Sequence, residues 1–256
     1  MVQIIQKFFN KLLSLFNLQI IKKNENGVID KRSVASFQIS DKHYKLYFEG
    51  LNKSKNNHSD NFWKQSRFLD LMNLVQMVLK KENTKDFAEV GCWKGHSSFF
   101  ISKLIAECNK KISFHIFDSF EGLSQASIKD ININKFEKNK IKEIRTQFIS
   151  DEQFVKSEVL KEFDFVKVYK GWIPEKFNMV DNSKFSFVHI DVDLYEPTLK
   201  SLEFFFPRLE EGGVIVCDDY NSVDFNGSKL AWDEFFSDKK VNFKFAPSLG
   251  GSFVIK

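Results

Sequence analysis

Residues 86–98 read DFAEVGCWKGHSS and indicate the fold of the chain. An apolar strand-like run enters a turn with two glycines, and the turn opens a helical segment. Gly91 and Gly95 permit a tight turn and a close ligand approach, and the helix N-terminus offers free N–H groups. The segment does not match the dinucleotide-binding fingerprint G-x-G-x-x-G, because the middle glycine is absent and Trp93 and Lys94 would crowd a pyrophosphate. We expect a nucleoside pocket; taken alone, the segment also fits a plain strand-to-helix turn.

Short apolar runs alternate with helical segments over the rest of the chain. Most runs are unbroken, which is typical of parallel strands that helices cover on both faces. The turn at 247–251 is too short for a crossover helix, so the last two strands should be antiparallel. The sequence predicts an α/β fold with a Rossmann-like doubly wound sheet, mostly parallel with an antiparallel C-terminal strand. The seven expected strands cover residues 86–90, 112–117, 163–168, 185–190, 214–217, 241–245 and 252–255, and a helix covers 68–79.

Acidic residues stand where three of these strands end, which is where ligands of doubly wound sheets bind. Asp118 ends the second strand and is placed to accept hydrogen bonds from two ribose hydroxyls. The fourth strand ends in Asp191 and Asp193, and the fifth in the pair Asp218 and Asp219. Adjacent strand ends lie about 5 Å apart, so the last four carboxylates should crowd one small volume.

Such crowding is costly without a cation. Hard oxygen ligands select Mg²⁺, Mn²⁺ or Ca²⁺ over zinc. Helix capping would explain any single aspartate, but hardly all four. Among the histidines, His115 and His189 lie in expected strands and are interpreted as hydrogen-bonded core residues, whereas His43 and His58 look like surface residues.

Composition narrows the class of protein. The formal charge is only +4 and basic residues are scattered among acidic ones, so we expect no nucleic-acid partner. Cys92 and Cys217 lie inside apolar runs and do not form a secreted disulfide framework, which favours a cytoplasmic location.

The first sixty residues differ from the rest. Residues 5–16 carry apolar side chains at helical spacing, which predicts an amphipathic helix that packs on its own domain or on a twin subunit, or else contacts a membrane surface. We place an N-terminal helix and linker region at 1–60 and the catalytic domain at 61–256, and we expect a homo-oligomer. The charged run 129–145 is interpreted as a solvated helix or as an insertion that covers the site.

The chain resembles the macrocin O-methyltransferases from about residue 61 to the C-terminus. That family methylates sugar hydroxyls with S-adenosylmethionine and Mg²⁺. The resemblance does not cover the N-terminal segment, and His96 stands where the family often has a second glycine, which bears on the shape of the turn. The segments that carry the resemblance are 89–98, 117–123, 170–172, 191–198 and 212–220.

The resemblance implies roles for particular residues. Asp193 would be the general base, with His96 or a metal-bound hydroxide as the next candidates. Asp191, Asp218 and Asp219 would hold Mg²⁺ (or Mn²⁺). S-adenosylmethionine would contact Asp118 through its ribose and Trp172 near its adenine, and its methionine part would be surrounded by Glu89, Gly91, Gly95 and Ser97. Further expected cofactor contacts are Trp93, Ser98 and Ser119.

We therefore expect an enzyme that transfers a methyl group to a sugar hydroxyl of a nucleotide-activated sugar, a polysaccharide unit or a glycoside. A catechol-type O-methyltransferase is the alternative, because catechol enzymes place similar acids at the same strand ends. A D-x-D nucleotide-sugar glycosyltransferase would use residues 191–193 with Mn²⁺, but it leaves 89–98 and the pair at 218–219 unexplained. A scaffold or membrane adaptor gives no reason for four acids at strand ends.

Overall fold

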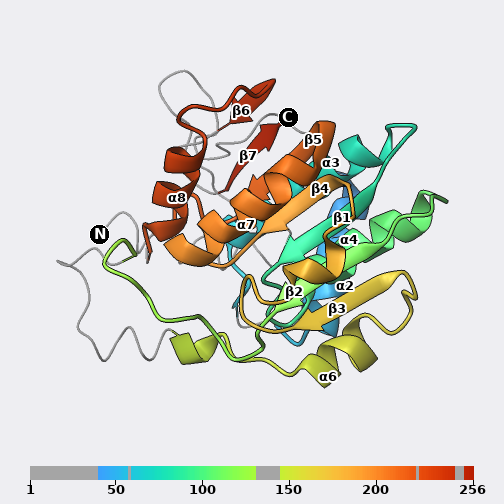
Figure 1. Cartoon of the computed structure of the whole chain (residues 1–256). Helices are drawn as coiled ribbons and strands as arrows, with labels where there is room; N and C mark the ends of the chain where they lie inside the picture. The colour runs from blue at the N-terminus through green and yellow to red at the C-terminus, as the bar shows by residue number, and fades with distance from the viewer. Residues whose placement is uncertain (1–39, 57–58, 131–144, 223–224, 246–250) are drawn as a thin grey trace, which may run out of the picture. The chain divides into compact units, whose positions relative to one another are not determined.

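The strands of the chain form one seven-stranded sheet in the order β3-β2-β1-β4-β5-β7-β6 (Figure 1). The structure is a computed structural model, and it describes residues 40–56, 59–130, 145–222, 225–245 and 251–256. The described residues belong to one compact unit that starts at Ala35. The strands are β1 (Asp86–Val90), β2 (Phe114–Asp118), β3 (Val166–Lys170), β4 (Phe185–Ile190), β5 (Leu209–Cys217), β6 (Phe243–Phe245) and β7 (Ser252–Ile255).

The pairing of the strands confirms the predicted fold class. β1 lies at the centre and pairs in parallel with β2 and β4, and β3 and β5 extend the parallel sheet outward. β7 then runs antiparallel to both β5 and β6. The carboxyl ends of β1, β2, β4 and β5 therefore meet at one edge of the sheet, which is the edge that carries the predicted site.

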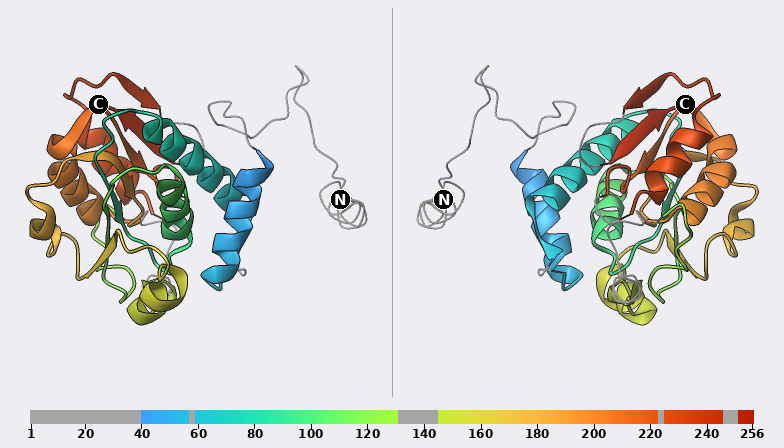
Figure 2. Two further views of the ribbon diagram at one scale, coloured as in Figure 1. Left: turned by 90° about the vertical axis from the view of Figure 1, so that its right-hand side faces the viewer. Right: turned by 90° about the vertical axis from the view of Figure 1, so that its left-hand side faces the viewer.

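Helices cover both faces of the sheet. α2 (Asp41–Lys53), α3 (Phe62–Leu79) and α4 (His96–Glu107) lie on one face, and α7 (Tyr195–Arg208) and α8 (Gly227–Phe235) on the other (Figures 1 and 2). Because strand side chains alternate, Phe87 packs under the first group and Ala88 under the second. Short helices α6 (Glu152–Phe154), η3 (Val155–Val159) and η4 (Phe177–Val180) join the strands.

The N-terminal part of this unit packs closely on the glycine turn. α2 shares one hydrophobic cluster with α3 and α4, and a Cβ at Gly50 would lie 2.8 Å from the ring of His96. The surface position predicted for His43 is wrong: its ring is buried and binds Ser40 and Gln76. α3 begins at residue 62, earlier than predicted, because the side chain of Asn61 accepts a hydrogen bond from the Lys64 N–H and caps the helix.

Several predictions fall outside the described residues. They are the amphipathic helix at 5–16, His58, and nearly all of the charged run 129–145. The division into an N-terminal region at 1–60 and a catalytic domain at 61–256 stays a prediction. Within the described part of the chain, no helix combines the length and the apolar character needed to cross a bilayer.

Candidate active site

The glycine turn after β1 brings two strand ends into contact. Gly91 and Gly95 have φ angles of 86° and 80°, in the left-handed region that favours glycine. A Cβ at Gly91 would lie 1.8 Å from the carbonyl oxygen of Asp191, so only glycine lets β1 and β4 approach this closely. A Cβ at Gly95 would lie 3.2 Å from both Val155 and Val159, so Gly95 makes room for η3.

Asp118, at the end of β2, holds this turn together. Its Oδ2 accepts hydrogen bonds from the N–H groups of Cys92 and Trp93 at 2.7 and 2.8 Å, and its Oδ1 accepts one from Phe120 at 2.7 Å. Burial raises the pKa of this carboxyl, and the three N–H donors oppose the rise. Asp118 therefore orders the turn directly, a role that the spacing of the sequence did not reveal.

A first cavity opens above the turn and brings together five of the residues predicted to contact a cofactor. Gly91, Trp93, Asp118, Ser119 and Trp172 line it. Glu89, Gly95, Ser97 and Ser98 are not among its lining residues. The other lining residues are Phe117, Gly122, Leu123, Ser124, Phe148, Ile173, Asp191, Val192, Asp193 and Pro197.

Glu89 and Ser98 instead form a buried layer below the site. The hydroxyl of Ser98 donates to Glu89 Oε2, and the Nδ1 of His189 lies 3.0 Å from Glu89 Oε1. Burial alone would lower the pKa of His189, but Asp218 and Glu89 outweigh it and raise that pKa to about 10. His189 is thus a hydrogen-bonded core histidine as predicted, and it also lies next to the acidic residues above it.

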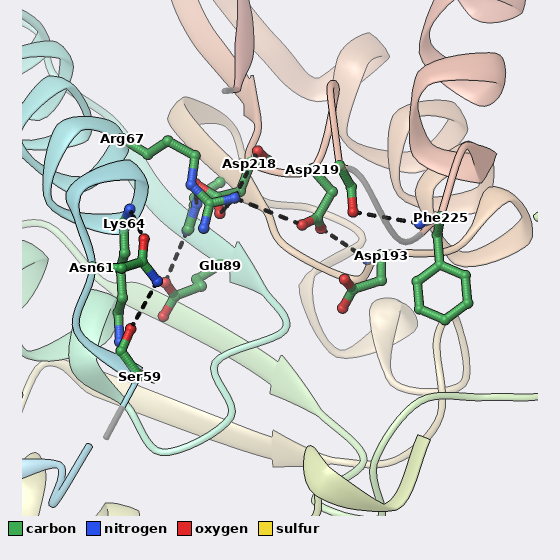
Figure 3. A network of polar contacts seen from close by, with 11 residues as sticks. Ser59, Asn61, Lys64, Arg67, Glu89, Asp193, Asp218, Asp219 and Phe225 are labelled. Carbon is green, nitrogen blue, oxygen red and sulfur yellow. Dashed lines mark hydrogen bonds and ion pairs between the residues drawn. The ribbon is translucent and has the colours of Figure 1, made fainter. Parts of the chain in front are cut away.

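The four aspartates predicted to meet do so at the ends of β4 and β5, and Figure 3 shows Asp193, Asp218 and Asp219. The N–H of Asp193, whose φ is 59°, donates to Asp219 Oδ2 at 2.9 Å. Burial and neighbouring carboxylates raise the pKa of Asp191 and, less strongly, that of Asp219. Asp191, Asp218 and His189 also offer ligand atoms that lie within 4.8 Å of one another. We call Asp191, Asp193, Asp218 and Asp219 the aspartate cluster.

Two cations of α3 face the aspartate cluster, and the sequence analysis missed both. The Nη1 of Arg67 lies 2.9 Å from Asp218 Oδ2 and 4.0 Å from Asp219 Oδ1 (Figure 3). Burial would lower the pKa of Arg67, but the aspartates raise it above its ordinary value. Burial lowers the pKa of Lys64 to about 8, while Asp191 opposes that shift. The signal was available: both residues interrupt a mostly apolar helix at i, i+3 spacing.

Arg67 and His189 together decide the charge of Asp218. Burial opposes the ionisation of this carboxyl, yet the guanidinium and the imidazole hold its pKa below the ordinary value. The Nε2 of His189 lies 3.7 Å from Asp218 Oδ1, on the oxygen that Arg67 does not contact. The protein itself therefore stabilises the ionised form of Asp218.

A second cavity adjoins the first. The two linings share Trp93, Phe148, Asp191 and Asp193, so these residues form a common wall. Ser97 lines this second cavity, not the first. The remaining lining residues are Asn56, Ser59, Asn61, Trp63, Lys64, Arg67, Phe68, Cys92, Lys94, His96, Asp219, Asn221 and Ser222.

His96, the alternative base, is held neutral. Its Nε2 lies 2.8 Å from the carbonyl oxygen of Tyr47, and its ring packs against Tyr47 and Phe68. Burial, with a contribution from Lys64, lowers its pKa to about 3. The residue that departs from the family pattern thus anchors α2 and α3 on the glycine turn.

A central parallel sheet, a glycine turn after β1 and acids at the ends of β2, β4 and β5 define a Rossmann-like fold of the methyltransferase type. The fold matches the O-methyltransferase NovP with a TM-score of 0.63 at 16% identity, over 84% of this chain and 99% of that one. It also matches the S-adenosylhomocysteine-bound methyltransferase PaMTH1 of Podospora anserina with a TM-score of 0.51 at 14% identity, over 93% and 98%.

The sequence places the chain more narrowly. The macrocin-O-methyltransferase (TylF) family model matches residues 48–246, so the chain belongs to that family, as the resemblance implied. A curated relative, the 8-demethyl-8-(2,3-dimethoxy-alpha-L-rhamnosyl)-tetracenomycin-C 4'-O-methyltransferase of Streptomyces olivaceus, is 28% identical over 159 residues. The match spans 60% of each of the two chains. The mycinamicin III 3''-O-methyltransferase of Micromonospora griseorubida is 23% identical, over 60% of this chain and 62% of that relative.

Proposed function

We propose that the protein is an S-adenosylmethionine-dependent, divalent-metal-dependent O-methyltransferase that acts on a hydroxyl of a sugar. One observation carries the proposal: Asp191 and Asp193 line both cavities. A donor in one cavity and an acceptor in the other would meet at these carboxylates. Methyl transfer needs that arrangement, because the acceptor oxygen must approach the methyl carbon opposite the sulfur.

The first cavity suits the cofactor. Asp118 Oδ1 accepts one N–H, which leaves room for a ribose hydroxyl on the same oxygen. Trp172 lines the cavity and offers a flat surface for adenine. Glu89, Gly95 and Ser98 would act from behind the turn, by keeping it in place. The S-adenosylhomocysteine bound to the fold relative supports a cofactor of this type.

The aspartate cluster fits a hard divalent cation. Among the described residues, Lys64 and Arg67 are the cations of α3 that face these carboxylates, while His189 is paired with Glu89. Burial and the neighbouring carboxylates raise the pKa of Asp191, and a divalent cation would offset that repulsion. Asp191, Asp218 and Asp219 would hold Mg²⁺ or Mn²⁺, with His189 below them. When bound, the ion would orient the acceptor hydroxyl and lower its pKa.

Asp193 would then remove the proton. Its left-handed backbone turns the chain at the wall shared by the two cavities, while its own N–H fixes Asp219. The hydroxyl oxygen would bond to the methyl carbon as the carbon–sulfur bond breaks, and the proton would pass to the Asp193 carboxylate. A general base of this kind typically contributes 10²–10⁴-fold, roughly, to the rate.

The second cavity suits a sugar. Half-exposed Trp63, together with Trp93 and Phe148, offers aromatic faces on which a sugar ring can pack. The rhamnosyl acceptor in the name of the Streptomyces relative supports this class. A nucleotide-activated sugar, a polysaccharide unit and a glycoside all carry such a ring.

The test is transfer of a labelled methyl group from S-adenosylmethionine to a panel of nucleotide sugars, glycosides and catechols. We expect label on a sugar, loss of turnover with chelator, and recovery with Mg²⁺ or Mn²⁺. Label on catechols alone would establish the catechol alternative. Full turnover of the metal-free enzyme would refute the metal, and failure to bind S-adenosylhomocysteine in calorimetry would refute the cofactor.

A further inference from the structure

The contact that Arg67 makes with the aspartate cluster is unusual for a structural arginine. A guanidinium that only holds a carboxylate usually presents two parallel N–H groups to it. Here the Nη1 of Arg67 contacts both the Oδ2 and the main-chain carbonyl oxygen of Asp218, at 2.9 and 3.3 Å. The same nitrogen lies 4.0 Å from Asp219 Oδ1. The Nε of Arg67 is buried and has no hydrogen-bond partner among the described residues.

This placement puts one positive charge between two neighbouring carboxylates (Figure 3). Asp218 and Asp219 are adjacent in sequence and both buried, so each would raise the cost of ionising the other. The single nitrogen that bridges them offsets that repulsion. It does so on the carboxylates that, in the proposed function, would hold the divalent ion.

We propose that Arg67 is a resident cation that stands in for the metal: it keeps Asp218 and Asp219 in place when no ion is bound, and it weakens divalent-cation binding by repulsion. The inference rests on the proposed metal site. It makes Arg67 a positioning residue that sets metal affinity, and it gives α3 a function beyond packing. Two positive charges near one carboxylate pair repel each other, so removing one must strengthen the binding of the other.

The test is Mn²⁺ binding, measured by the electron paramagnetic resonance of free Mn²⁺ on protein stripped with chelator. Arg67→Gln removes the charge and keeps a donor for Asp218, and Arg67→Lys keeps the charge. We expect Arg67→Gln to bind Mn²⁺ at least about tenfold more tightly than wild type. Arg67→Lys should stay within about threefold of wild type, because the repelling charge remains.

Lys94→Met is the matched control. Lys94 lines the same cavity, but no ion pair joins it to the aspartate cluster within the described residues, so its loss should change Mn²⁺ affinity by less than about threefold. A thermal unfolding series completes the design: metal-free Arg67→Gln should melt below wild type and regain the difference in saturating Mn²⁺.

The outcomes separate the inference from the proposed function. Equal or weaker Mn²⁺ binding by Arg67→Gln would overturn the resident-cation role, and weaker binding by both Arg67 variants would assign the arginine to structure alone. If the wild-type protein bound no Mn²⁺ and Asp191→Asn gave the same result, the proposed metal site itself would be refuted. Should Arg67→Gln not fold, Arg67→Met with the same titration decides the question.

Discussion

Replacing Gly91 by alanine should lower both the stability of the fold and the affinity for the cofactor, because Gly91 lies against the main chain of Asp191, a candidate metal ligand. The φ of Gly91 is 86°, and a Cβ there would lie 1.8 Å from the carbonyl oxygen and 2.8 Å from the carbonyl carbon of Asp191. Both are main-chain atoms, so no side chain can turn away. The ends of β1 and β4 would have to separate.

The size of the effect follows from two contributions. A non-glycine residue in the left-handed region costs about 1–2 kcal/mol. Forcing an additional atom into a packed region costs about 1–3 kcal/mol more. Gly212→Ala isolates the first contribution, because Gly212 has a φ of 68° but its Cβ would meet the Nζ and Cε of Lys81, the end of a flexible side chain.

Urea unfolding measures the difference. The free energy of unfolding should fall by about 2–5 kcal/mol in Gly91→Ala and by about 1–2 kcal/mol in Gly212→Ala. Calorimetry should show weaker S-adenosylhomocysteine binding only for Gly91→Ala, since Gly91 lines the first cavity. Equal destabilisation of the two variants, with unchanged S-adenosylhomocysteine affinity, would refute the reasoning.

Three further predictions concern single residues. Asp118→Ala leaves three N–H groups without their acceptor. S-adenosylhomocysteine affinity should therefore drop at least about tenfold in calorimetry, and the free energy of unfolding should fall by about 1–3 kcal/mol in urea titration. If neither quantity changed, Asp118 would not order the glycine turn. Asp193→Asn should lower kcat by about 10²–10⁴-fold while cofactor affinity changes little, and metal affinity should fall less than in Asp191→Asn; a near-native kcat would move the base elsewhere. Burial lowers the pKa of His96 to about 3, so the folded protein keeps it neutral while the unfolded chain binds a proton below about pH 6.5. The contribution of neutral His96 to the free energy of unfolding is complete above pH 6.5 and is lost towards pH 3, by up to about 1.4 kcal/mol per pH unit. Urea titrations of His96→Gln should lack that part of the pH dependence. An unchanged pH dependence in the variant would contradict this role of His96.

The periodicity of apolar residues and the order of the motifs predicted the fold. Unbroken apolar runs placed β1, β4 and β7 at their observed bounds, since strands buried on both faces have few other compositions. The second strand begins two residues later than predicted and the third begins three residues later, whereas β5 begins earlier, because strand ends depend on pairing partners that local composition does not encode.

The predicted site residues fall into two groups, those that line a cavity and those buried below it, and packing decides which residue belongs to which group. Gly91, Asp118 and Trp172 line a cavity, whereas Glu89 points below the sheet edge to Ser98 and His189. Side chains alternate along a strand, but which face meets solvent depends on the helix that covers it.

What the sequence determined by itself is the chemistry: a glycine turn, an acid after the second strand and four acids after the fourth and fifth, in an order that names the family. These features are local, and the topology of a doubly wound sheet gathers them at one edge. What the tertiary structure alone decided is the charge balance. Arg67 and Lys64 reach the aspartate cluster from a helix more than a hundred residues earlier. Their i, i+3 spacing is visible in the sequence, but the local pattern does not encode which residues they contact over that separation.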